Sequence, residues 1–198
     1  MDRLENMFIE MIAGSRSKDN NSFCGDTYFT ELTQNEFICV LADGLGSGRY
    51  AFESSNAAAE VVKQKWQSET IEDLMEAVNQ SLHQKRGAAV ALFKINFNTR
   101  QFEYACVGNI RFYLYAPNGK LTYPLPVTGY LSGRPQRYRI ERFSYEQGSK
   151  FLVHSDGIAL LNTKELMRYR TTEQIAAELD GVAVKSNDDA TFIVGNLL

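Results

Sequence analysis

The stretch that decides the fold is FICVLADGLGSGR, residues 37–49. It begins with six consecutive apolar residues, a run typical of a strand that is buried on both faces. The strand leads directly into Asp43, and glycines at positions 44, 46 and 48 allow the backbone to approach a ligand closely. We therefore expect an acidic side chain at the rim of a buried sheet, followed by a helix whose N-cap is Ser47.

The composition is that of an ordinary globular protein. The chain has 198 residues, of which 44% are hydrophobic and 23% charged, and its net charge is −3. We expect one domain over residues 1–198 and no nucleic-acid partner, because the chain lacks a basic excess. No apolar run approaches the roughly 20 residues of a membrane span, and the N-terminus does not resemble a secretion signal. The three cysteines have no metal-like or redox-like spacing, which favours a reducing cytoplasm.

Hydrophobic periodicity places strands and helices in separate blocks. Strands are predicted at residues 8–13, 27–32, 36–42, 88–97, 101–107, 110–115, 140–145, 150–154 and 190–194, and helices at 47–66, 70–83 and 171–179. The second and third strands are predicted to form a hairpin, and the strands of residues 88–115 an antiparallel meander. Residues 14–21 are predicted to be a turn or loop. Helices between blocks of antiparallel strands indicate an α+β sandwich rather than alternating βαβ units.

Four aspartates share a local signature, since each lies beside a turn residue where an apolar run begins or ends. They are Asp26, Asp43, Asp156 and Asp188. One Asp-Gly step after a strand is usually only a turn. Several carboxylates can crowd together in ionised form only if cations neutralise them, and an all-oxygen set selects Mg²⁺ or Mn²⁺ rather than Zn²⁺. Two such ions about 4 Å apart can activate a bridging water and hold a phosphoryl group.

The order of these motifs along almost the whole chain resembles the metal-dependent (PPM, type 2C) protein Ser/Thr phosphatases. The matching motifs are Gly25-Asp26, Ala42-Asp43-Gly44, Val107-Gly108-Asn109, His154-Ser155-Asp156-Gly157 and Asp188-Asp189-Ala190-Thr191. The resemblance implies an antiparallel β-sandwich flanked by helices in α-β-β-α layers, with two Mn²⁺ or Mg²⁺ ions at one edge.

The resemblance also implies a role for each matching residue. Asp43 would be the catalytic residue that bridges both metals and a hydroxide, and the Gly44 carbonyl would be a backbone ligand. Asp26 would serve one ion, partly through water, and Asp156 and Asp188 would complete the other. The implied reaction is in-line hydrolysis of phosphoserine or phosphothreonine without a phospho-enzyme. The absence of a Cys-x5-Arg motif argues against phosphatases with a cysteine nucleophile.

Two further segments, residues 85–88 and 129–133, resemble one compact bacterial branch of this family. That branch includes a feedback phosphatase of the general stress response, so the resemblance implies the phosphorylated stressosome proteins RsbS and RsbR as substrates. The short chain has little room for an inserted domain and predicts a monomer. Two alternatives stay open: a catalytically inactive binding module that keeps the fold (a pseudophosphatase), and an enzyme for small phosphate esters.

The chain departs from the family pattern at several positions; among them, Gly87-Ala88-Ala89 replaces a Gly-Ser/Thr-Thr sequence and loses a hydroxyl near the site. Asn109 and Leu160 stand where members with a third metal carry aspartates, so we predict that a third ion is weak or absent. Ser22 stands where eukaryotic members carry a phosphate-binding arginine. The phosphate must therefore be bound mostly by the metals, or by an arginine elsewhere.

Other candidate groups have weaker support. The glycines of residues 44–48 lack the lysine of a phosphate-binding P-loop, so nucleotide binding is not expected. We expect His154 to be a packed side chain rather than a catalytic one. A basic and aromatic segment is either a solvated surface or a dock for a phosphorylated protein, with Arg134 and Arg137 as the predicted substrate-binding residues. It comprises Tyr130, Arg134, Arg137, Tyr138, Arg139 and Arg142.

Overall fold

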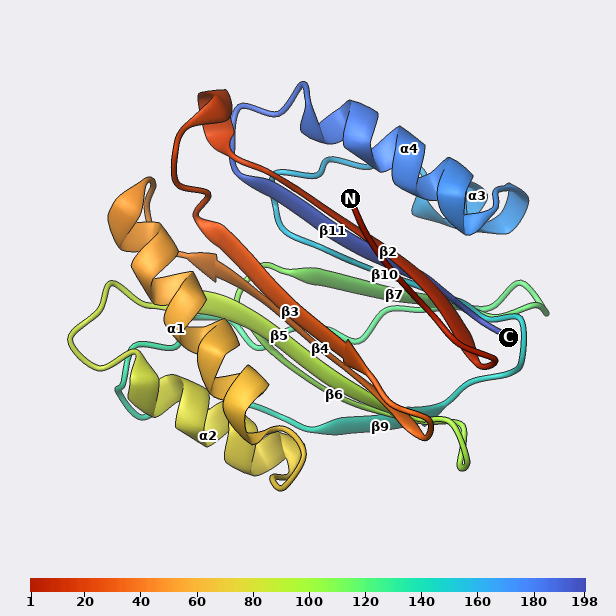
Figure 1. Ribbon diagram of the computed structural model, residues 1–198, viewed down its shortest axis with the longest axis horizontal. Helices are drawn as coiled ribbons and strands as arrows, with labels where there is room; N and C mark the ends of the chain where they lie inside the picture. Colours follow the sequence, from red (N-terminus) through yellow and green to blue (C-terminus); the bar gives the residue numbers. More distant parts are fainter.

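The computed structural model describes residues 1–198, except for the side chain of Asn20. Two antiparallel sheets face each other, and a pair of helices covers the outer face of each (Figure 1). This α-β-β-α arrangement confirms the predicted fold class. Within the described residues, no helix is long and apolar enough to cross a membrane.

The first sheet has six strands in the order β1-β2-β11-β10-β7-β8, and the second has five in the order β3-β4-β5-β6-β9. In the first sheet the bounds are Asp2–Glu5 (β1), Ile9–Arg16 (β2), Ala190–Leu197 (β11), Lys150–His154 (β10), Arg111–Tyr115 (β7) and Leu121–Thr122 (β8). In the second they are Asp26–Leu32 (β3), Glu36–Gly44 (β4), Ala88–Asn96 (β5), Gln101–Val107 (β6) and Glu141–Ser144 (β9). A short 3-10 turn, η1 (Lys18–Asn20), follows β2.

The helices over the second sheet are α1 (Arg49–Lys65) and α2 (Ile71–Ser81). Helix α2 begins with a capping box, in which the Thr70 side chain accepts from the Asp73 amide while the Asp73 side chain accepts from the Thr70 amide. The predicted cap of α1 is wrong. Gly48, with φ 68°, precedes the helix and no side chain caps it. Ser47 therefore lies in the glycine loop, one residue before the cap position.

The helices over the first sheet are α3 (Thr163–Tyr169) and α4 (Thr172–Ala183). The sequence predicts only the first part of α4 and does not predict α3. Helix α3 has seven residues, which is too short for a clear helical pattern of apolar residues. Asn162 starts α3 by accepting a hydrogen bond from the Glu165 amide, and Thr171 and Gln174 form a capping box at α4.

Three predictions about strands need correction. Residues 14–16 continue β2, and β1 and β8 were not expected. The meander over residues 88–115 is wrong, because β5 pairs with β6 whereas β7 pairs with β10 in the other sheet. The chain changes sheets at Gly108, whose φ of 119° and close approach to Ala89 exclude a side chain there. Alternation of apolar residues predicts a strand but not the sheet that it joins.

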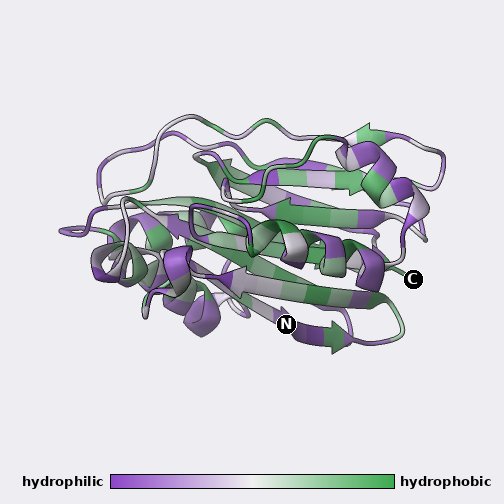
Figure 2. Cartoon of the chain, turned by 90° about the horizontal axis from the view of Figure 1, so that it is seen from above, coloured by the Kyte–Doolittle hydropathy of each residue, from purple (hydrophilic) through white to green (hydrophobic). Residues whose placement is uncertain are grey.

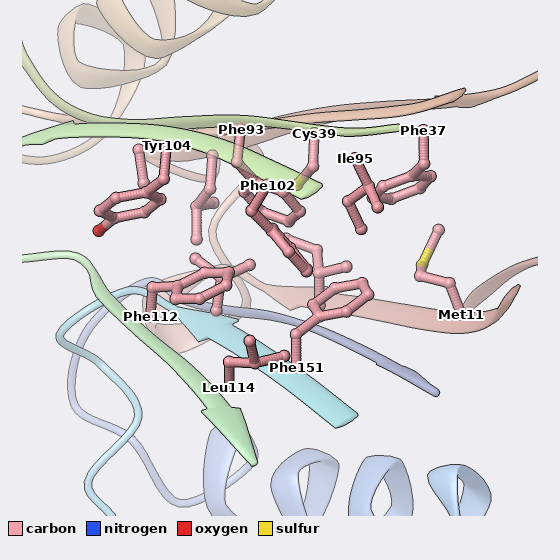
Figure 3. Packing of buried hydrophobic residues seen from close by; sticks show 14 of the residues in the cluster. Met11, Phe37, Cys39, Phe93, Ile95, Phe102, Tyr104, Phe112, Leu114 and Phe151 are labelled. Atoms are coloured by element: carbon pink, nitrogen blue, oxygen red, sulfur yellow. The ribbon is translucent and has the colours of Figure 1, made fainter. Parts of the chain in front are cut away.

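The main core lies between the sheets and is rich in phenylalanine. Figure 3 shows Phe93 and Phe102 of the second sheet pointing toward Phe112 and Phe151 of the first. Their rings meet edge to face, with centroids 5.3 Å apart for Phe93 and Phe112 and 5.5 Å apart for Phe93 and Phe151. Each sheet also has a smaller apolar cluster between its outer face and the helices that cover it. In Figure 2 the central strands are mostly hydrophobic, whereas β1 beside the N-terminus is mostly hydrophilic.

Candidate active site

Strand β4 carries Asp43 into the space between the sheets. Phe37, Cys39 and Leu41 belong to the core between the sheets, whereas the residues between them pack under α1 and α2. Because side chains alternate along a strand, Asp43 continues the face of Leu41. Asp26 lies directly opposite Asp43 in the β3–β4 register, so both carboxylates occupy the same face at the same end of the sheet.

The other sheet brings two more aspartates to this end. Asp156 follows the end of β10, Asp188 precedes the start of β11, and these two strands are paired. Ser155 links the sheets. Its amide donates to the carbonyl of Thr191 at 3.0 Å, and its hydroxyl donates to Oδ2 of Asp26 at 2.6 Å. The four predicted aspartates therefore lie at the same edge of the sandwich.

Burial and mutual repulsion raise the pKa values of the inner carboxylates. Asp26 is 4% exposed, and burial raises its pKa to about 7 although the hydroxyls of Ser155 and Thr191 oppose the shift. Burial and then the charges of the other aspartates raise the pKa of Asp43 to about 8. The second carboxylate oxygen of Asp26, Oδ1, is buried without a hydrogen-bond partner. A buried acceptor among like charges is an environment that a cation stabilises.

The donor set fits a hard divalent ion in its chemistry, since it consists of carboxylate and carbonyl oxygens. Within the described residues, however, no group of three or more His, Cys, Asp or Glu side chains is arranged so that it could hold an ion by itself. Asp156 and Asp188 are exposed, and the Asp188 side chain accepts from the Asp189 amide at 2.9 Å. An ion here would therefore need backbone or water ligands, or a turn of these two exposed side chains.

Gly44 has a structural requirement of its own. A Cβ at this position would collide with the backbone carbonyl of Ala51 in α1, so only glycine lets the helix lie this close to β4. The amide of Gly44 donates to the carbonyl of Gly25 at 3.1 Å. These contacts fix the loop that follows Asp43, and they leave the predicted role of the Gly44 carbonyl as a ligand a prediction.

Two of the positions that depart from the family pattern, Asn109 and Leu160, have other partners. Asn109 donates from Nδ2 to Oδ2 of Asp156 at 2.7 Å, and this bond opposes the rise that burial and Asp188 cause in the pKa of Asp156. Leu160 packs against the apolar cluster beneath α3 and α4. Asn109 therefore holds an aspartate in place, and Leu160 contributes to packing.

His154 is a packed side chain, as predicted. It is 1% exposed and stacks on Tyr113 with ring centroids 6.0 Å apart. Its Nδ1 lies 2.8 Å from the carbonyl of Ser155. Burial lowers the pKa of His154 to about 4, so the ring is neutral at physiological pH.

Sequence reasoning assigned no role to several residues that build this edge. Ser155 and Thr191 lie in the quoted motifs, but their contact with the distant Asp26 has no sequence signal. Asp189 is buried, accepts from the Lys18 amide at 2.9 Å and adjoins Gly25, so it ties the segment after β2 to this edge. The signal that it offered was its position directly before an apolar strand.

The basic and aromatic segment separates into two parts. Arg139 pairs with Glu141 at 3.0 Å and Arg142 with Glu103 at 2.6 Å, as in an ordinary solvated surface. Arg134 instead lines a hollow of about 440 Å³. Arg137 is exposed and does not line that hollow.

The sequence pattern of one protein family matches residues 33–190, most of the chain: the family described as "Stage II sporulation protein E (SpoIIE)". The chain belongs to this family and is a phosphatase of the PP2C (PPM) type, which confirms the resemblance inferred from its motifs.

Individual relatives agree with this assignment. The chain is 42% identical over 194 residues to the phosphoserine phosphatase RsbX of Bacillus subtilis (strain 168), covering 98% of this chain and 97% of RsbX. A crystal structure of RsbX in complex with magnesium superposes with a TM-score of 0.95 at 41% identity, covering 100% of this chain and 99% of that one. A structure from a study of the bacterial stressosome and secondary messenger signalling has a TM-score of 0.82 at 25% identity, covering 94% and 98%.

Proposed function

We propose that this protein is a phosphoserine/phosphothreonine protein phosphatase that uses two Mn²⁺ or Mg²⁺ ions at the edge described above. The observation that carries the proposal is the placement of four aspartates from two sheets at one edge, with the buried Oδ1 of Asp26 lacking a partner. The magnesium complex of the 41% identical RsbX supports the choice of ion.

Each residue would contribute in a distinct way. Asp43 would be the ligand shared by the two ions, and the Gly44 carbonyl, Asp26, Asp156 and Asp188 would supply the other protein oxygens. When bound, such ions lower the pKa of water and neutralise the charge of a phosphoryl group. Ser155 fixes the orientation of Asp26 through its 2.6 Å hydrogen bond. His154 is neutral and buried, so it is not available to donate a proton to the leaving group.

We infer that the substrates are phosphorylated stressosome proteins, namely RsbS and RsbR, and that their dephosphorylation provides negative feedback on the general stress response. The 42% identity to RsbX and the likeness to the stressosome-related structure support this inference. Action on these partners would place the protein in the cytoplasm, in agreement with its free cysteines. We further infer that it acts as a monomer and as a single domain.

The rival function is a pseudophosphatase that binds phosphoproteins without turnover. All four aspartates are retained, and this favours an enzyme. A third possibility, an enzyme for small phosphate esters, differs in substrate only. Activity toward phosphorylated RsbS compared with p-nitrophenyl phosphate separates it from a protein phosphatase.

The deciding experiment measures phosphate release from phosphorylated RsbS with Mn²⁺ and with EDTA. Wild type is compared with Asp43→Asn and with a matched control, Asp180→Asn, whose carboxylate pairs with Arg16 at 2.9 Å on the surface of α4. We expect metal-dependent release that Asp43→Asn abolishes and Asp180→Asn leaves intact. Failure of the folded wild type to release phosphate from RsbS, RsbR or p-nitrophenyl phosphate would favour the binding module.

A further inference from the structure

A ridge formed by Gln84, Lys85 and Arg86, of which the last two are basic, borders the loop that follows Asp43. Arg86 is exposed, and its guanidinium carbon lies 4.9 Å from the centre of the Tyr50 ring. Its Nη1 lies 2.5 Å from the point that a Cβ at Gly46 would occupy. Because Gly46 is only three residues beyond Asp43, the ridge adjoins the carboxylate edge.

The backbone that carries the ridge is held at several points. The carbonyl of Gly87 accepts from the Leu45 amide at 2.9 Å, and Ala88 and Leu131 exchange two hydrogen bonds of 2.9 Å. The Lys85 amide donates to the carbonyl of Leu82 at 3.0 Å. A surface whose backbone is fixed in advance loses less entropy when a partner binds.

Two hollows of about 440 Å³ each adjoin the ridge, and residues 84–86 line both. Tyr50 lines the first hollow, and Tyr130 and Arg134 line the second. The two tyrosines are 61% and 46% exposed. Exposed tyrosine and arginine are enriched where proteins bind other proteins.

The charge of this surface is positive and largely uncompensated. Among the residues that the structure describes, Lys85, Arg86 and Arg134 form no ion pair. Glu53, the acidic residue in the first hollow, is already paired with Arg49 at 2.8 Å. A local excess of cations in a chain of net charge −3 favours an acidic partner over a basic one.

We propose that the ridge and its two hollows bind an acidic polypeptide segment that carries the phosphoserine. The acidic side chains on either side of the phosphorylated residue pair with Lys85, Arg86 and Arg134. This inference rests on the proposed function, because it gives the substrate polypeptide a place beside the carboxylate edge.

The test compares two phosphoserine peptides, one with acidic and one with uncharged flanking residues, and p-nitrophenyl phosphate, all with Mn²⁺. The variants are Arg86→Gln and Arg134→Gln, and the control is Arg100→Gln, an exposed arginine beyond the opposite end of β5. We expect both Arg86→Gln in the ridge and Arg134→Gln in the second hollow to raise KM for the acidic peptide by about tenfold with kcat unchanged. The small ester and the control variant should be unaffected, and added salt should weaken the preference for the acidic peptide.

Two results overturn the proposal: equal KM values of the wild type for both peptides, or an equal rise in KM for p-nitrophenyl phosphate in Arg86→Gln, which would place Arg86 at the reacting phosphate. If the wild type releases phosphate from none of the three, the proposed function fails. Fluorescence anisotropy with the labelled acidic peptide then tests the ridge separately. Tighter binding of the peptide by wild type than by Arg86→Gln supports the ridge as its binding surface, and equal binding overturns the proposal.

Discussion

Strand β4 passes through two regions of opposite character on one face. In its middle, Phe37, Cys39 and Leu41 lie in a core in which apolar side chains contact one another. At its end, Asp43 lies among carboxylates, and Asp26 keeps a buried oxygen without a partner. The difference shows that the layer between the sheets stabilises the fold along most of its length but destabilises it at the acidic edge. A bound ligand can restore the stability that is lost at this edge.

The most severe disruption of the edge is Asp43→Asn. We expect phosphate release to fall more than about a hundredfold, because even residues that only support metal ligands cost 10–100-fold when lost. The melting temperature of the metal-free protein should rise, since one of several mutually repelling carboxylates is removed. Phosphate release with Mn²⁺ and thermal unfolding in EDTA measure the two effects. Loss of activity together with a lower melting temperature would contradict this account of the edge.

A matching change in the core is Phe93→Ala. Phe93 is fully buried and contacts Phe37, Phe102, Phe112 and Phe151. We expect the free energy of unfolding to fall by about 3–5 kcal/mol, with activity per folded molecule retained. Urea unfolding and kcat at low temperature measure these quantities. The half-buried Phe143 offers a control, for which Phe143→Ala should cost less.

The two regions should also respond differently to pH in the absence of metal. The pKa values of Asp26 and Asp43 are raised to about 7 and about 8 by burial, so the folded state favours their protonated forms. Their contribution to stability is full below about pH 4 and is lost as pH rises through these values. His154, whose pKa is lowered to about 4, acts in the opposite direction only below about pH 6.5.

We therefore expect the free energy of unfolding in EDTA to fall by a few kcal/mol between about pH 6.5 and 8.5. Mn²⁺ should remove most of this fall, because the ions replace the protons. Urea unfolding at several pH values, with EDTA or with Mn²⁺, measures the slope. Asp43→Asn should show a shallower slope in EDTA, and equal slopes with and without Mn²⁺ would argue against ion binding at this edge.

Local sequence determines much of this fold but not the contacts between distant segments. The hairpin of β3 and β4 and the capping box at Thr70 were predictable, because alternation and capping act over a few residues. The sheet that β7 joins was not, since a strand pattern does not name its partner. In the candidate site, each aspartate had a local signature, and the family resemblance grouped the four. The bond between Ser155 and Asp26 joins residues 129 positions apart, and only the fold brings them together.

The mildest test of the edge concerns Asn109, which donates to Asp156 at 2.7 Å. Asn109→Ala leaves Asp156 free to turn, so we expect the Mn²⁺ concentration for half-maximal activity to rise by up to about tenfold. Stability should change by only about 1 kcal/mol or less, since one exposed hydrogen bond is lost. Asn118→Ala is the matched control, because Asn118 makes the same kind of bond to Glu146 at 3.0 Å in a turn after β7. If both variants keep the wild-type Mn²⁺ requirement, Asn109 does not position Asp156 for an ion. Its hydrogen bond would then be an ordinary surface bond, like that of Asn118.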